Sequence, residues 1–110
     1  MKEIKAIVKT NMLDPVLDAL MGIPGLPGVT LSEIEGFGRQ RGGGDKAEGQ
    51  YAFVRKSKLE IVVPDHLVDR VVGVIREAAH TGQPGDGKIF VADVVHALRI
   101  RTGEEGDAAL

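Results

Sequence analysis

The chain has no cysteine and no tryptophan, and aromatic residues make up only 4% of its 110 residues. Without cysteine it can form neither disulfides nor thiolate metal sites. The few aromatic rings offer little on which nucleic-acid bases could stack. The formal net charge of −2 provides no general excess of basic residues for following a phosphate backbone. The composition therefore argues against cysteine chemistry and against a nucleic-acid-binding module.

Long hydrophobic runs are missing as well. No stretch approaches the ~20 apolar residues that a membrane-spanning helix needs. The opening MKEIKAIVK interrupts its apolar residues with charges and cannot serve as the hydrophobic region of a signal peptide. What remains is an ordinary globular balance, with 43% hydrophobic and 27% charged residues. We expect one cytoplasmic domain spanning residues 1–110, with a single modest core.

Hydrophobic periodicity predicts two strand-helix-strand halves. Asp14 and Pro15 are expected to cap and begin the first helix. The predicted strands are 1–9, 29–35, 59–63, 88–92 and 96–101, and the predicted helices are 14–21 and 64–80. This order predicts an α+β, ferredoxin-like βαββαβ sandwich with a short C-terminal strand, in which Leu98 and Ile100 point inward. Both helices should cover one sheet face.

The opposite face of the predicted sheet also carries apolar residues. They are Ile7, Ile34, Val62 and Phe90. Because a large exposed apolar face is unusual in a monomer, self-association is expected.

Residues 36–55, GFGRQRGGGDKAEGQYAFVR, have no hydrophobic period. A loop of about twenty residues in a compact domain is usually functional or disordered. Its G-x-G is compatible with a phosphate-binding turn or with a hinge, since Arg41 occupies the place of a third glycine. Tyr51 and Phe53 either contact a partner or fold back onto the domain.

The stretch TGQPGDGKIFV, residues 81–91, has Gly82, Gly87 and Lys88 at the spacing of a P-loop. However, Ile89 replaces the magnesium-binding hydroxyl, and a strand follows instead of a helix. Gly85 to Lys88 therefore form either an anion-binding turn of another kind or an ordinary β-turn.

Arg99 and Arg101 lie two apart in the predicted last strand, and so on one side of it. Their guanidinium groups suit phosphate oxygens, although a solvated strand face is the alternative. Taken with Lys88, they suit a polyphosphate. The three histidines, His66, His80 and His96, have no metal-ligand spacing, and no catalytic constellation is evident.

Together, these motifs resemble the PII signal-transduction proteins along essentially the whole chain. The matching stretches are MKEIKAIVK, GFGRQ at 36–40, LEIVVPD at 59–65, TGQPGDGKIFV at 81–91 and RIRTGEEGDAAL at the end. The resemblance implies a homotrimer with its sheets facing inward, which binds ATP or ADP in clefts between subunits. It also implies sensing of 2-oxoglutarate with Mg-ATP, and control of a target protein through a mobile T-loop.

Site residues carry over by matching positions. The T-loop is about 36–55, the B-loop about 81–88 and the C-terminal segment about 96–110. The implied nucleotide-binding residues are Ile7, Gly28, Thr30, Gly36, Gly38, Arg39, Gln40, Glu60, Val62, Gly85, Asp86, Gly87, Lys88, Arg99 and Arg101. Those implied for 2-oxoglutarate are Gly38, Arg39, Gln40 and Lys56, and Gln40 is also implied for Mg. The two arginines would come from the neighbouring subunit.

The predicted T-loop departs from the family pattern. It is a few residues shorter, contains Gly42-Gly43-Gly44, and has Tyr51 in the context EGQYAF instead of R-G-A-E-Y. Tyr51 is therefore a candidate for modification or partner contact without matching the modified tyrosine directly. The resemblance implies a target that is a nitrogen-metabolism enzyme, a transcription regulator or a membrane transporter. Alternatives are a PII-like regulator of metal efflux or bicarbonate transport, and a nucleotide-hydrolysing enzyme of the same fold.

Overall fold

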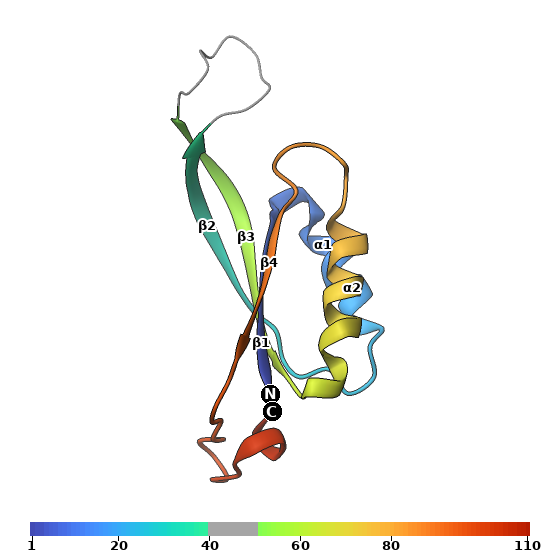
Figure 1. The fold of residues 1–110 in the computed structure, drawn as a ribbon, viewed down its shortest axis with the longest axis vertical. Helices are drawn as coiled ribbons and strands as arrows, with labels where there is room; N and C mark the ends of the chain where they lie inside the picture. Colours follow the sequence, from blue (N-terminus) through green and yellow to red (C-terminus); the bar gives the residue numbers. More distant parts are fainter. Residues whose placement is uncertain (40–50) are drawn as a thin grey trace.

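A computed structural model describes residues 1–39 and 51–110. Their order is β1 (Lys2–Lys9), α1 (Leu13–Met21), β2 (Thr30–Arg39), β3 (Tyr51–Val63), α2 (Val68–Ala79) and β4 (Gly87–Asp93), with 3₁₀ turns at Thr10–Met12, Asp65–Leu67 and Gly106–Ala109. The strands form one sheet in the order β2-β3-β1-β4, and all neighbours are antiparallel. Both helices lie on the same side of this sheet (Figure 1). The predicted α+β, ferredoxin-like arrangement is confirmed.

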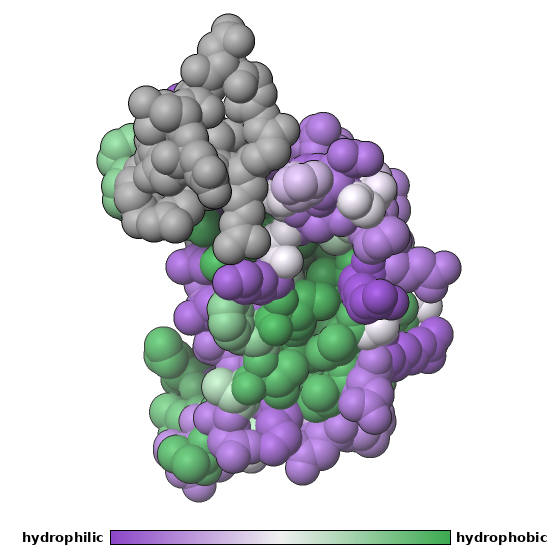
Figure 2. All heavy atoms as spheres, turned by 45° about the horizontal axis from the view of Figure 1, so that its top comes forward, coloured by the Kyte–Doolittle hydropathy of each residue, from purple (hydrophilic) through white to green (hydrophobic). Residues whose placement is uncertain are grey.

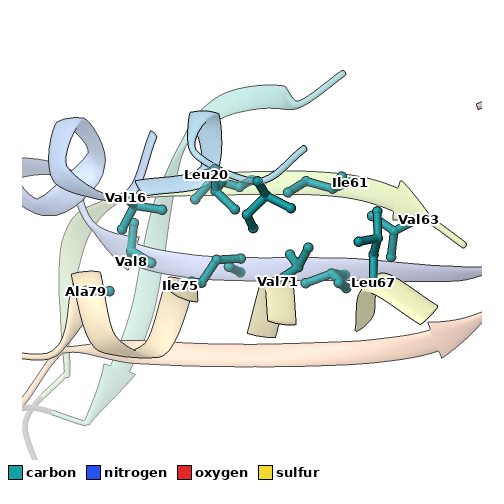
Figure 3. Close-up of a cluster of buried hydrophobic side chains, with 13 residues drawn as sticks. Val8, Val16, Leu20, Ile61, Val63, Leu67, Val71, Ile75 and Ala79 are labelled. Atoms are coloured by element: carbon teal, nitrogen blue, oxygen red, sulfur yellow. The ribbon is translucent and has the colours of Figure 1, made fainter. Parts of the chain in front are cut away.

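The core lies between the helices and one face of the sheet (Figure 3). Alternate residues of β1 and β3 point into it, because strand side chains alternate between faces, and each helix contributes a stripe. The central buried residues are Ile4, Ala6, Val8, Val16, Leu20, Leu59, Ile61, Val63, Val71 and Ile75. The inward face of β3 is thus formed by Leu59, Ile61 and Val63.

The beginning of α1 differs from the expectation. Asp14 does not cap this helix, because the 3₁₀ turn Thr10–Met12 leads directly from β1 into it and Met12 occupies the cap position. Asp14 lies in the first turn instead, where a carboxylate interacts favourably with the positive end of the helix dipole. The predicted end of α2 at His80 is confirmed.

Residues 36–39 and 51–55 form a hairpin arm. The prediction that this part of the chain lacks regular structure is wrong for these residues, since Gly36 pairs with Val54 and Arg39 with Tyr51. Phe37 and Phe53 face each other across the strands, with ring centroids 4.9 Å apart. Cross-strand pairing of this kind stabilises a strand whose local sequence shows no period. The arm extends past the helices (Figure 1), and residues 40–50 lie outside the described residues.

The C-terminal segment does not form the expected strand at 96–101. It makes one bridge, between Leu98 and Glu105, with hydrogen bonds from Arg99 N to Glu104 O and from Gly106 N to Ala97 O. Leu98 is 52% exposed and Ile100 is 96% exposed, so the inward orientation predicted for both is wrong. The segment continues past the end of β4 and then returns, so that the two ends of the chain lie close together (Figure 1).

Among the residues described, neither helix has the length and apolar character needed to cross a membrane. The sheet face that the helices leave open retains the expected apolar residues. Ile7, Ile34 and Val62 are partly buried there, and Phe90 is 51% exposed. Self-association through this face stays a prediction.

Candidate functional site

Lysine side chains gather at one end of the open sheet face. The strand register pairs Lys9 with Lys56, and Ile7 with both Lys58 and Lys88. Paired residues project from the same side of a sheet, and Ile7 and Lys9 alternate with the core residues of β1. The four lysines, which we call the lysine face, are Lys9, Lys56, Lys58 and Lys88.

The lysines of the lysine face differ in their partners. Lys58 forms an ion pair with Glu60 at 3.3 Å, and Lys9 forms one with Asp86 at 3.2 Å. Lys56 donates a hydrogen bond to the carbonyl oxygen of Gly85. Lys88 is exposed and makes no hydrogen bond or ion pair with the described residues. This region therefore has an excess of positive charge, and one ammonium group is available to an external anion.

The turn at 81–87 is organised around one carboxylate. Asp86 Oδ2 accepts hydrogen bonds from the backbone N–H groups of Thr81 and Gly82, both at 2.9 Å, and Oδ1 accepts one from the Thr81 hydroxyl. The hydroxyl bond is the main reason that the pKa of Asp86 is well below its usual value, and the backbone bonds and Lys9 act in the same direction. The turn is consequently fixed without any ligand.

Gly87 is required at the junction of this turn with β4. Its φ of +103° is one that residues with a side chain rarely adopt. A Cβ atom built on Gly87 would lie 1.7 Å from the carbonyl oxygen of Ile7. The backbone of the turn thus runs directly against β1, and this close approach positions Lys88 beside Ile7.

A second group of the predicted residues lines a cavity of about 310 Å³. Its lining residues are Glu3, Pro27, Gly28, Thr30, Glu60, Val62 and Leu110. Arg99 belongs to the same end of the molecule, because its Nη2 donates a hydrogen bond to the Leu110 carbonyl oxygen at 2.7 Å. Four of the residues expected to bind nucleotide, Gly28, Thr30, Glu60 and Val62, therefore share one cavity. Arg99 is hydrogen-bonded to Leu110, which lines the same cavity.

The two arginines are not on one side of a strand, contrary to the expectation. Arg99 lies at the start of a tight turn, since Gly103 N donates to Arg99 O at 2.8 Å, and its guanidinium also pairs with Glu104 at 3.2 Å. Arg101 lies within this turn, where its exposed side chain has no hydrogen-bond or ion-pair partner in the described part of the chain. Arg99 and Arg101 do not alternate along a strand because, within residues 1–39 and 51–110, no other strand lies beside this segment to pair with it.

The two groups of predicted residues reach opposite edges of the sheet, through Thr30 on β2 and Lys88 on β4, while Glu60 and Val62 lie on the central strand β3. Thr30 and Glu60 pair with each other on β2 and β3, whereas Gly87 and Lys88 begin β4. At ~4.8 Å per strand, the three steps from β2 to β4 amount to about 14 Å. Ile7 belongs with Lys88. A single chain therefore holds two separate half-sites, and it does not bring Arg99 next to Lys88.

The remaining predicted residues lie on or beyond the hairpin arm. The backbones of Gly36, Gly38 and Arg39 are in β2, and Tyr51 begins β3 opposite Arg39. Gln40, and with it the predicted Mg contact, lies outside the described residues. Within residues 1–39 and 51–110, no group of three or more His, Cys, Asp or Glu side chains is arranged to hold a metal ion.

Sequence reasoning missed Lys9 and Thr81. Lys9 ends β1 on the same side as Ile7, so its strand alternation was the available signal. Thr81 begins the turn and is five residues from Asp86, and short polar side chains at such positions commonly bond nearby backbone groups. Lys58 was overlooked as a cation because its role depends on the pairing of β3 with β1.

Comparisons with known proteins show which family the sequence matches. The family profile described as "Nitrogen regulatory protein P-II" matches residues 1–104. "Nitrogen regulatory protein P-II 1" of Escherichia coli (strain K12) is 51% identical over 113 residues, which cover 100% of both chains. "Nitrogen regulatory protein P-II" of Bradyrhizobium diazoefficiens is 50% identical over 109 residues, or 96% of each chain. That of Haemophilus influenzae is 50% identical over the full length of both.

Proposed function

The chain belongs to the nitrogen regulatory protein P-II family, a family of signal-transduction regulators and not of enzymes, and we propose that it reports ATP and ADP levels to a target protein. Family membership disfavours the alternative of a nucleotide-hydrolysing enzyme. P-II proteins bind nucleotides and interact with target proteins. Which nucleotide, which target and which residues of this chain are involved are the parts that we propose.

The observation that carries the proposal is the turn beside the lysine face. It presents backbone at glycine positions, where N–H groups can approach an anion closely, together with the free ammonium group of Lys88. Lys9 and Lys58 are paired with carboxylates, whereas Lys56 and Lys88 have no carboxylate partner among the described residues, so a nearby anion would relieve the repulsion between their positive charges. A nucleotide polyphosphate supplies several negative charges over the required span.

The nucleotide site is completed by a second copy of the chain. The two half-sites reach opposite edges of one sheet, so that Gly28, Thr30 and Arg99 of one copy would meet Lys88 of the next. Exposed apolar side chains support such an assembly, and those on and after β4 are Phe90, Val91, Val95, Leu98 and Ile100. Hydrophobic residues also reach the surface on the face drawn in Figure 2, where hydrophilic residues surround them. A closed homotrimer with three clefts satisfies both requirements.

A magnesium ion and 2-oxoglutarate are the finer part of the proposal. The nearest carboxylate to the turn, Asp86, is already engaged by Thr81, Gly82 and Lys9. The described residues therefore fit a Mg ion that arrives on the phosphates better than one that the protein holds alone. Gln40, which lies outside the described residues, is the additional ligand that we propose. Lys56, bonded to Gly85, is suitably placed for a dicarboxylate next to the nucleotide phosphates.

The output is assigned to the T-loop, about residues 36–55, of which the hairpin arm is the base. A ligand that binds one arrangement of this loop more tightly shifts its population and so the affinity for the target. The names of the relatives favour a target in nitrogen metabolism over metal efflux or bicarbonate transport. Tyr51, at the beginning of β3, is a candidate for modification or target contact. The expected location is the cytoplasm, with recruitment to a membrane when the target is a transporter.

Titration calorimetry with ATP and ADP tests the nucleotide assignment. Lys88→Ala removes one charge-assisted contact to phosphate and should weaken ATP binding by about 10- to 100-fold, the equivalent of about 1.5–3 kcal/mol. Arg70→Ala is the matched control, because Arg70 is an exposed cation on α2, and its removal changes the net charge equally. Equal ATP affinity in the two variants would refute the assignment, and so would a wild-type protein that binds neither nucleotide.

A further inference from the structure

We propose that Asp86, Thr81 and Lys9 form a brace that holds the phosphate-binding turn in shape, so that Asp86 is a positioning residue and not itself a ligand of the nucleotide. The inference rests on the proposed nucleotide-binding function and specifies how the turn achieves it. Asp86 was expected to bind the nucleotide, and the brace gives it a positioning role instead. Thr81 and Lys9 join it, although the sequence motifs did not indicate a role for either.

The hydrogen-bonding capacity of the Asp86 carboxylate is already used. A carboxylate has about four lone-pair sites and no hydrogen to donate. Oδ2 accepts from Thr81 N and Gly82 N, and Oδ1 accepts from the Thr81 hydroxyl and lies 3.2 Å from Lys9 Nζ. Phosphate oxygens are also acceptors with negative charge. Direct contact between Asp86 and a nucleotide would therefore be repulsive, and it would have to break bonds that exist without the ligand.

The brace ties together three separate parts of the fold. Thr81 follows the end of α2, Asp86 precedes β4, and Lys9 is the last residue of β1. Lys9 Nζ also lies 3.1 Å from the Thr81 hydroxyl, so each of the three side chains contacts the other two. The Asp86 and Lys9 side chains are only 24% and 25% exposed. Residues 82–85 are closed into a loop whose ends cannot separate while the brace is intact.

A closed loop lowers the cost of binding. Fixing one backbone residue costs about 1–2 kcal/mol in conformational entropy, and a loop that is ordered beforehand avoids that cost when the ligand arrives.

The brace also gives the lysines different roles. Lys9 is neutralised by Asp86 and serves the turn, whereas Lys88 remains available to the phosphates. Other groups near the turn are Lys56, on the Gly85 carbonyl, and the His80 ring, 3.8 Å from a Cβ atom built on Gly82.

A double-mutant cycle in ATP affinity tests the brace. Thr81→Val removes the hydroxyl without changing the net charge, and Asp86→Asn removes the carboxylate while keeping its shape. We expect each to weaken ATP binding by about 5- to 10-fold, and the double variant to be no weaker than the weaker single variant, because both break one unit. Thr81→Ser, which keeps the hydroxyl, should stay within about twofold of the wild type. The pair Thr81→Val and Lys88→Ala should instead be additive.

The results that would contradict the brace can be told apart from those that would contradict the proposed function. Tighter ATP binding by Asp86→Asn would show a carboxylate that faces the phosphates, and additive losses from Thr81→Val and Asp86→Asn would show two independent contacts. Either result overturns the brace. If wild-type protein binds ATP and Lys88→Ala weakens it, but Thr81→Val has no effect, the brace is wrong and the proposed function stands. If wild-type protein does not bind ATP, the proposed function fails.

Amide hydrogen exchange on the ligand-free protein provides a second test that does not depend on nucleotide. The N–H groups of Thr81 and Gly82 donate to Asp86, and that of Gln83 donates to the Thr81 hydroxyl. We expect these amides to exchange about 10-fold faster in Asp86→Ala, which removes both acceptor oxygens, while the amides of β1 and β3 keep their protection. Unchanged exchange at Thr81 and Gly82 would overturn the brace, whatever the ATP affinities are.

Discussion

Replacing Gly87 by alanine should be among the most damaging single changes on the surface of this domain. Two independent penalties apply at this position. Alanine rarely adopts a φ of +103°, and strained backbone of this kind costs about 1–3 kcal/mol. In addition, the new Cβ atom would have to move from 1.7 Å to at least 3.0 Å from the Ile7 carbonyl oxygen.

The second penalty acts on the pairing of β1 with β4. The Ile7 oxygen belongs to the backbone and cannot turn aside, so β4 must retreat at the end where Gly87 pairs with Val8. Loss of about two backbone hydrogen bonds adds about 2 kcal/mol. The total of about 3–5 kcal/mol is a large part of the 5–15 kcal/mol that stabilises a typical domain.

Alanine variants at two other glycines separate the cost of backbone strain from the cost of the close contact with β1. Gly25 has a φ of +76° and open space around it, so Gly25→Ala measures backbone strain alone, about 1–2 kcal/mol. Gly73 lies inside α2 with no atom within 4 Å, and Gly73→Ala should stabilise the protein by about 1 kcal/mol.

Urea unfolding, followed by circular dichroism at one fixed protein concentration, gives the three free energies under comparable conditions. The expected order of stability is Gly73→Ala, wild type, Gly25→Ala and then Gly87→Ala. If Gly87→Ala is no less stable than Gly25→Ala, the close approach of the turn to β1 is wrong. The description of how Lys88 is positioned would then need revision as well.

Two further predictions concern the core and acid stability. Ile75→Ala, at a fully buried position of α2, should cost about 3 kcal/mol in the same urea experiment, whereas the exposed Ile100→Ala should change the stability of the isolated fold by less than about 0.5 kcal/mol. The pKa of Asp86 is lowered by the Thr81 hydroxyl and that of Asp65 by the N-terminal ammonium, both from 3.8, so their contribution is present above pH 3.8 and is lost as pH falls below it. Thermal melts from pH 6 to pH 2 should show this loss, and Asp86→Asn should make the decline shallower; an equally steep decline in that variant would contradict the assignment to Asp86.

Most of the fold is predictable because the core depends on local pattern. Ile4, Ala6 and Val8 alternate, as do Leu59, Ile61 and Val63, and either set alone indicates a strand with one buried face. The hairpin arm was missed because its evidence is not local. Residues 36–39 and 51–55 have polar, glycine-rich sequences, and they become strands only through pairing with each other, including Phe37 with Phe53.

The site could be predicted less fully than the fold. The glycines and lysine at 85–88 mark an anion-binding turn by their residue types alone, and the motif matches the family. The cluster of Lys9, Lys56 and Lys58 around it requires the register of β1 with β3, which a single sequence does not reveal. Arg99 and Arg101 were placed on a strand by their alternation, but a strand forms only where another strand is available to pair with it.

Because β3 is one continuous strand, it limits the ways in which a conformational change can pass between the lysine face and the hairpin arm. Its 13 residues run from the arm, at Tyr51, to the far end of the core, at Val63, with Lys56 between them. Sliding this strand by one position would turn Leu59, Ile61 and Val63 out to solvent, so translation along its axis is forbidden on energetic grounds. A conformational change at the lysine face can therefore reach the hairpin arm only as a change in the twist, the bending or the local separation of β2 and β3. The part of β3 that carries Leu59, Ile61 and Val63 stays fixed in the core.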